Sequence, residues 1–211
     1  MKIIPVDIPN GDITLEGEWL FPDGEELFPA VVVAHPFPPM GGTMYNGVVT
    51  AIWQTLASRE IAALRFNFRG VGKSGGSFSD GIGERDDIKA ALEVAFRTDG
   101  IDVDRVGLAG YSFGAMMSVP VALREERVKC LAVVSAPLSA DNWTKLDGYR
   151  KPHLVVVGEK DDMVPMDLFH RQMEKESNFG TYHIIAEADH GLFGYEEEVG
   201  QVVADFFTAN I

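Results

Sequence analysis

Hydrophobic and polar positions follow two different periods along this chain. Short segments of strand type, rich in apolar residues, occur at residues 30–34, 61–68, 103–109, 130–134, 154–157 and 182–185. Between them, apolar residues recur at helical spacing, most regularly in segments 48–56 and 88–96. A wholly apolar run such as 30–34 suits a strand buried on both faces of a parallel sheet. The succession therefore predicts an α/β fold: a doubly wound, mostly parallel β-sheet with helices on both faces.

The two ends of the chain carry patterns of their own. Residues 2–21 are typical of two strands joined at Asn10-Gly11-Asp12, so we expect an N-terminal β-hairpin. A helix is predicted from Pro165 to about Lys175, and a last helix has its apolar residues between Val199 and Phe207 on one face. Pro120 conflicts with a long unbroken helix, so the helix around it should be kinked or short.

Composition narrows the function classes. At 211 residues the chain is expected to form a single domain, residues 1–211. A net charge of -14 with a pI near 4.7 argues against nucleic acid and anionic membrane surfaces as partners. We find no segment with the length of a signal peptide core or a membrane span, and we expect a cytoplasmic protein. No Cys/His cluster suggests a metal site, and the oligomeric state stays open.

A candidate nucleophile follows the strand segment 103–109. The sequence Gly110-Tyr111-Ser112-Phe113-Gly114 has the G-x-S-x-G spacing of a nucleophile elbow and leads into helix-compatible residues. A serine raised on such a sharp turn leaves no room for a Cβ two positions before or after it, which glycine satisfies. Gly72-Lys73-Ser74-Gly75-Gly76 has the same spacing but continues into a Gly/Ser-rich loop, so Ser112 is predicted as the nucleophile and Ser74 is not.

Other strand ends supply an acid and a base. The run 154–157 is followed by Asp161 and Asp162, and the strand 182–185 is followed by His190. In doubly wound folds the chemistry gathers at the carboxyl ends of the strands, and the order Ser, Asp, His is that of an α/β-hydrolase triad. His190 is the predicted general base. From position alone, both aspartates compete for the role of orienting it.

Two backbone N–H groups are candidates for an oxyanion hole. One belongs to Phe113, directly after the nucleophile, and the other to the loop after strand 30–34. In that loop Phe37 is the candidate, because the neighbouring prolines have no N–H to donate. The alternative is that His35-Pro36-Phe37-Pro38-Pro39 is a stiff turn without a catalytic part. His35 itself is expected to brace the loop through a hydrogen bond.

These segments together resemble the α/β-hydrolase superfamily, in particular its small lidless members related to dienelactone hydrolases and to bacterial esterase- and thioesterase-like proteins. The resemblance covers nearly the whole chain and rests on His35–Pro38, Gly41–Met44, Asn67–Ser74, the elbow, Gly158–Pro165 and Asp189-His190. It implies a triad of Ser112, Asp161 and His190 and a second oxyanion donor at Phe37. Dienelactone hydrolases use a cysteine nucleophile, and this elbow carries serine instead.

The expected activity is that of a serine hydrolase that cleaves small carboxylic esters through an acyl-enzyme, without a cofactor. Its partner would be a small-molecule ester or acyl substrate. A thioesterase or C–C bond hydrolase on the same triad, and a non-catalytic binding or scaffold member of the fold, remain alternatives. The short stretch between residues 135 and 154 leaves no room for a cap domain, so the site should be open and favour short-chain, soluble esters. Candidate substrate-binding side chains are Met40, Tyr45, Met116, Trp143 and Leu192.

Overall fold

The computed structural model describes residues 1–24, 27–174 and 180–211. Within these ranges one sheet of eight strands has the order β1-β2-β4-β3-β5-β6-β7-β8. The strands are β1 (Lys2–Asn10), β2 (Ile13–Phe21), β3 (Phe28–Ala34), β4 (Ala62–Phe66), β5 (Ile101–Tyr111), β6 (Val128–Val134), β7 (His153–Gly158) and β8 (Gly180–Ile185). The helices are the 3-10 turn η1 (Pro38–Met40), α1 (Gly47–Ser58), α2 (Glu84–Arg97), α3 (Phe113–Ala122), α4 (Ala140–Asp147), α5 (Met166–Met173) and α6 (Glu196–Asn210).

The predicted topology is confirmed. Strands β3 to β8 are parallel to one another, while β1 and β2 form an antiparallel hairpin whose strand β2 pairs antiparallel with β4. The hairpin turns between Asn10 and Ile13, where Gly11 has a left-handed φ of 59° that a glycine adopts without steric cost.

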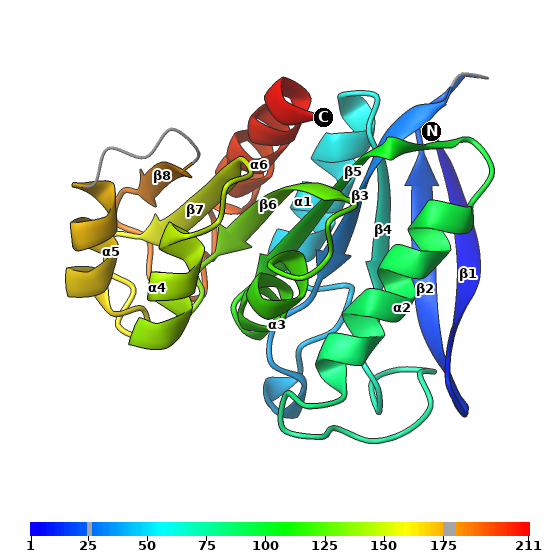
Figure 1. Ribbon diagram of the computed structural model, residues 1–211, viewed down its shortest axis with the longest axis horizontal. Helices are drawn as coiled ribbons and strands as arrows, with labels where there is room; N and C mark the ends of the chain where they lie inside the picture. The colour runs from blue at the N-terminus through cyan, green and yellow to red at the C-terminus, as the bar shows by residue number, and fades with distance from the viewer. Residues whose placement is uncertain (25–26, 175–179) are drawn as a thin grey trace.

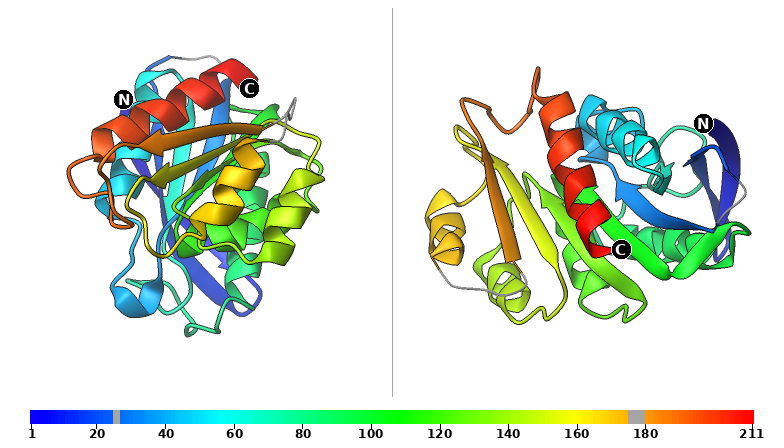
Figure 2. Two further views of the ribbon diagram at one scale, coloured as in Figure 1. Left: turned by 90° about the vertical axis from the view of Figure 1, so that its left-hand side faces the viewer. Right: turned by 90° about the horizontal axis from the view of Figure 1, so that it is seen from above.

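Helices cover both faces of the sheet (Figures 1 and 2). Helices α1 and α6 lie on one face, and α2, α3, α4 and α5 lie on the other. Strand β3 supplies both cores, since Val31 and Val33 pack under α1 and α6 while Val32 packs on the opposite side. This double burial explains the unbroken apolar run A-V-V-V-A at residues 30–34, because neither face of the strand meets water.

In the part of the chain that the structure describes, no cap domain covers the carboxyl edge of the sheet. The connection from β6 to β7 contains only α4 among its described helices and strands. Helix α3 ends two residues after Pro120, which bears out a short helix. Helix α5 ends at Met173, and Lys175, the predicted end of this helix, lies outside the described residues. In the described ranges no helix has the length and apolar character needed to cross a membrane.

Candidate active site

Ser112 stands on a strained turn between β5 and α3. Its φ of 51° and ψ of -114° are rare for a residue with a side chain. A Cβ on Gly110 would lie 2.5 Å from the backbone nitrogen of Ala115, and one on Gly114 would lie 2.4 Å from the carbonyl oxygen of Ala34. Both contacts are far shorter than van der Waals distance and both involve backbone atoms. The two glycines of the motif are therefore required by the close approach of α3 to the ends of β5 and β3.

The side chains of Ser112, His190 and Asp161 form one hydrogen-bonded chain. Ser112 Oγ lies 2.9 Å from His190 Nε2, and His190 Nδ1 lies 3.0 Å from each carboxylate oxygen of Asp161. An ionised carboxylate only accepts, so Nδ1 carries the proton and donates it toward Asp161. The lone pair of Nε2 then faces the serine hydroxyl, which is the tautomer that a general base needs.

Asp161 is fixed by more than the imidazole. Its Oδ1 also accepts the backbone N–H groups of Met163 and Val164, at 3.0 and 3.1 Å. Burial raises the pKa of Asp161, but the hydrogen bonds and charge of His190 and the two N–H groups outweigh it, so the pKa lies below its ordinary value. Asp162 is exposed, and among the described residues its side chain makes no hydrogen bond. Of the two aspartates that compete by position, Asp161 is therefore the one that contacts His190.

Tyr111 connects strand β5 to the loop that carries His190, and the sequence pattern did not reveal this contact. Its buried hydroxyl donates to the carbonyl oxygens of His190, at 2.9 Å, and of Gly191, at 3.2 Å. Burial, followed by the charges of Asp161 and Asp189, raises the pKa of the phenol to about 12, so it remains a donor at any working pH. The one available signal was its place beside Ser112, where a strand residue points away from the serine.

The residues that carry the two predicted oxyanion donors pack against each other through their rings. The rings of Phe37 and Phe113 have centroids 5.5 Å apart, and Phe78 packs against both. Neither the Phe37 N–H nor the Phe113 N–H has an acceptor in the described part of the chain. The Phe37 carbonyl accepts the N–H groups of Met40 and Gly42, which closes the turn that presents the Phe37 amide. Free backbone donors of this kind are what a developing oxyanion requires.

His35 has a structural place, as expected. The imidazole is fully buried, its Nε2 accepts the N–H of Phe68 at 3.0 Å, and its Nδ1 therefore donates to the carbonyl of Pro36 at 2.7 Å. Burial lowers the pKa of His35 to about 4, although the Pro36 carbonyl opposes the shift, so the ring is neutral at physiological pH. It ties the loop after β3 to the loop after β4.

Ser74 is likewise structural. Its hydroxyl donates to the carbonyl of Asn67 at 2.7 Å and accepts the N–H of Glu16 at 2.9 Å, so both its partners are backbone groups. Neither bond involves a general base. The serine of the second G-x-S-x-G match therefore joins the loop after β4 to strand β2.

Two buried carboxylates organise that loop, and the sequence pattern did not reveal them. Glu84 is fully buried and accepts the N–H groups of Ser79 and Gly81, each at 2.8 Å. Asp87, also fully buried, pairs with the guanidinium of Arg69 at 2.7 Å. Both acids lie in the first turn of α2, where the sequence resembles an ordinary solvent-exposed, charged helix start. They hold the segment that brings the Phe78 ring against the rings of Phe37 and Phe113.

The predicted substrate-binding residues divide into two groups. Met40 is 82% exposed, Met116 is half-buried one turn after Ser112, and Tyr45 is exposed with its hydroxyl bonded to Glu18. Trp143 and Leu192 require a correction, because both are buried in the core and have almost no surface to offer a substrate. Trp143 packs on α5 through Phe169, while Leu192 belongs to the core under α1 and α6.

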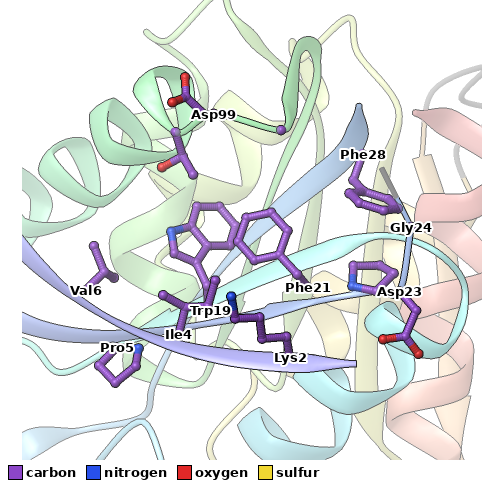
Figure 3. Close-up of a pocket in the computed structure, with 13 residues that line it drawn as sticks. Lys2, Ile4, Pro5, Val6, Trp19, Phe21, Asp23, Gly24, Phe28 and Asp99 are labelled. Carbon is purple, nitrogen blue, oxygen red and sulfur yellow. The ribbon is translucent and has the colours of Figure 1, made fainter. Parts of the chain in front are cut away.

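A cavity of about 590 Å³, drawn in Figure 3, has no residue of this site in its lining. It opens between the hairpin and the turn from α2 to β5, and its lining includes Trp19, Phe21, Phe28 and Gly100. Gly100 precedes β5 and Ser112 follows it, so the 11-residue strand separates the two places by roughly 35 Å. No group of acids, histidines and cysteines among the described residues could hold a metal ion.

Comparison with known proteins identifies the family. The family model of the X-Pro dipeptidyl-peptidases (S15 family) matches residues 11–200, which is most of the chain. The chain belongs to the S15 family. Another relative is an uncharacterised protein of Rickettsia prowazekii, 30% identical over 187 residues that cover 84% of this chain and 78% of that protein.

Solved structures place this S15 family member among the α/β serine hydrolases. An α/β serine hydrolase homologue from Coxiella burnetii is 32% identical, with a TM-score of 0.84 and 96% of each chain covered. A lidless α/β serine hydrolase from Xanthomonas campestris is 27% identical, with a TM-score of 0.81 over 97% of this chain and 93% of that chain. The resemblance to small lidless α/β-hydrolases is thereby confirmed.

Proposed function

We propose that this protein is a serine hydrolase that cleaves small carboxylic esters through an acyl-enzyme. The observation that carries the proposal is the continuous chain from Ser112 Oγ through His190 to Asp161, with distances of 2.9 and 3.0 Å. A serine with a purely structural role does not require a histidine held in this tautomer. A serine that acts as a nucleophile does require it, because its proton must be transferred to a base.

Each step has a group in place. Ser112 Oγ attacks the ester carbonyl carbon while His190 Nε2 takes its proton, and the N–H groups of Phe37 and Phe113 hold the oxyanion of the tetrahedral intermediate. The intermediate collapses, the C–O bond to the alcohol breaks, and His190 returns the proton to the leaving oxygen. Water then attacks the acyl-enzyme by the same route and releases the acid. Asp161 stays ionised, as the direction of its pKa shift supports, and stabilises the imidazolium.

The alternatives use the same triad on another bond. A thioesterase would release a thiol, which needs less help from His190 because thiols are better leaving groups than alcohols. A peptidase, the activity in the name of the S15 family, would have to protonate an amine. Ester cleavage is favoured here because an alcohol leaves more readily than an amine and because the described connection from β6 to β7 contains no cap domain over the site. The non-catalytic alternative leaves the hydrogen-bonded chain and the strained serine without a purpose.

A substrate panel separates these activities. We expect the protein to hydrolyse p-nitrophenyl butyrate with a kcat/KM at least about tenfold above that for a butyryl thioester, and to leave Gly-Pro-p-nitroanilide intact. Ser112→Ala should lose these activities by a factor of about 10⁴ or more. If the protein prefers the thioester or the anilide, the proposed function changes from an esterase to a thioesterase or a peptidase. If a folded protein hydrolyses none of these substrates, the result would favour the non-catalytic alternative.

A further inference from the structure

The most exposed large apolar side chains of the described chain belong to loops at the candidate active site. Met40 is 82% exposed, Phe193 80% and Ile82 78%, and no other exposed large hydrophobic residue in the described ranges passes 62%. A hydrophobic side chain that stays exposed to water does not contribute to the stability of the fold. Three such side chains at one edge of an acidic protein indicate that an apolar group covers them.

Phe193 lies on the histidine side of the site. It follows His190 by three residues, and a Cβ on Gly191 would lie 2.6 Å from the Phe193 ring, so the ring lies against the backbone directly beyond the base. The loop that carries it is held by the hydroxyl of Tyr111. The exposed ring is therefore presented at a fixed place beside His190.

Met40 and Ile82 lie on the oxyanion side. Met40 donates its N–H to the carbonyl of Phe37 at 3.1 Å, within the turn that presents the Phe37 amide. Ile82 follows Gly81, where an added Cβ would lie 3.8 Å from the Phe113 ring. The two loops contact each other through Phe37 and Phe78, and they run side by side at the lower edge of Figure 1.

Proton transfer fixes which half of an ester meets which side. His190 Nε2 must return its proton to the leaving oxygen, so the alcohol lies beside the histidine loop. The carbonyl oxygen points to the Phe37 and Phe113 amides, and the acyl chain leaves the reacting carbon away from His190. We propose that Phe193 binds the alcohol group of the substrate and that Met40 and Ile82 bind its acyl chain. This inference rests on the proposed function.

The substrate class that follows is an ester with apolar groups on both sides of the carbonyl. Burying one methylene completely would raise kcat/KM roughly fourfold. Contact with an open surface on one side should give roughly half of the corresponding free energy, which is about twofold in kcat/KM per methylene. The increase should therefore continue over a few carbons, as suits short-chain, soluble esters, and then stop where the chain passes beyond the loops.

Two ester series test the assignment. One varies the acid from acetate to hexanoate with p-nitrophenol as the leaving group, and the other varies the alcohol from methanol to hexanol with acetate as the acid. The wild-type protein should gain about twofold per methylene in each series. Met40→Ser with Ile82→Ser should lower the hexanoate-to-acetate ratio of kcat/KM by roughly three- to tenfold and leave the alcohol ratio in place. Phe193→Ser should lower the hexanol-to-methanol ratio of kcat/KM by a similar factor and leave the hexanoate-to-acetate ratio unchanged.

Leu27→Ser is the matched control, because Leu27 is 60% exposed directly before β3, at the amino end of the strand, whereas the site lies at the carboxyl ends. Its two ratios should equal those of the wild type. Flat series in an active wild-type protein, or variants that change both ratios alike, would overturn the inference and leave the proposed function standing. A dimer that Phe193→Ser dissociates would make this surface an interface between copies, which also overturns it. If no ester reacts at all, the proposed function fails as well.

Discussion

The hydroxyl of Tyr111 donates a hydrogen bond of 2.9 Å to the backbone carbonyl of His190. Residue 111 immediately precedes the candidate nucleophile, so one residue of the elbow holds the loop that carries the base. Together with the contact between His190 Nδ1 and Asp161, this bond sets the distance between Nε2 and Ser112 Oγ. Tyr111 is thus a positioning residue in this account.

Tyr111→Phe keeps the buried ring and removes only the donor. We expect kcat to fall about three- to thirtyfold with KM nearly unchanged, because a displacement of well under 1 Å at the base already costs catalysis. Labelling of Ser112 by a fluorophosphonate should slow by the same factor. The measurement is a kcat and KM pair for wild type and variant, together with the labelling rate.

Tyr149→Phe is its control. Tyr149 is also buried, and within the described residues its hydroxyl has no hydrogen-bond partner. Its loss should leave kcat and the labelling rate unchanged. Equal effects of the two substitutions would mean that removing any buried phenol loosens the fold, and Tyr111 would then have no special link to His190.

The two neighbouring aspartates should separate cleanly. Asp161→Asn presents an amide to His190 Nδ1 and supports the wrong imidazole tautomer, a change that costs about 10⁴ in kcat in the well-studied serine proteases. Asp162→Asn changes an exposed carboxylate, so its activity and melting temperature should match the wild type. Assays of kcat and melting temperature on both variants check this. Loss of catalysis with residue 162 instead would contradict the observed hydrogen bonds.

His35 makes stability depend on pH. Its pKa is about 4 in the folded protein against 6.5 for an ordinary histidine. Between these values the unfolded chain binds a proton that the folded protein does not, so the free energy of unfolding decreases as the pH falls from 6.5 toward 4. The slope is about 1.4 kcal/mol per pH unit, which amounts to about 2 kcal/mol between pH 7.5 and pH 5. Above pH 6.5 this contribution is constant.

Urea denaturation of the wild type and of His35→Gln at both pH values isolates that contribution. The glutamine can still accept the Phe68 N–H but does not titrate, while Asp161 and every other acid are the same in both proteins. The variant should be less stable at pH 7.5 and should lose about 2 kcal/mol less on acidification. Parallel losses in the two proteins would show that the buried imidazole is not the titrating group.

The sequence allowed the sheet, the hairpin and the elbow to be predicted, because each depends on local spacing. Gly110 and Gly114 indicate the elbow by their spacing around Ser112, without reference to distant segments. The apolar run at 30–34 indicates a strand buried on both faces. Contacts between distant segments left no such signal. Tyr111 and His190 are 79 residues apart, and nothing in either segment indicates the bond between them.

Burial was the harder quantity to predict at single positions. Glu84 and Asp87 resemble the solvated first turn of a helix, yet both are fully buried because the loop before α2 folds back over them. Trp143 and Leu192 resemble pocket residues by type and by their closeness to strand ends, and instead fill the core. An apolar residue after a strand can face either the site or the core, and the sequence pattern does not separate the two.

In the proposed mechanism, Ser112 is a nucleophile activated by His190. The most direct test is covalent labelling with a fluorophosphonate, followed by intact mass and peptide mapping, on the wild type, Ser112→Ala and Ser74→Ala. We predict one adduct on Ser112 in the wild type and in Ser74→Ala, and none in Ser112→Ala. Labelling that persists in Ser112→Ala, or that disappears in a folded Ser74→Ala protein, would contradict the account.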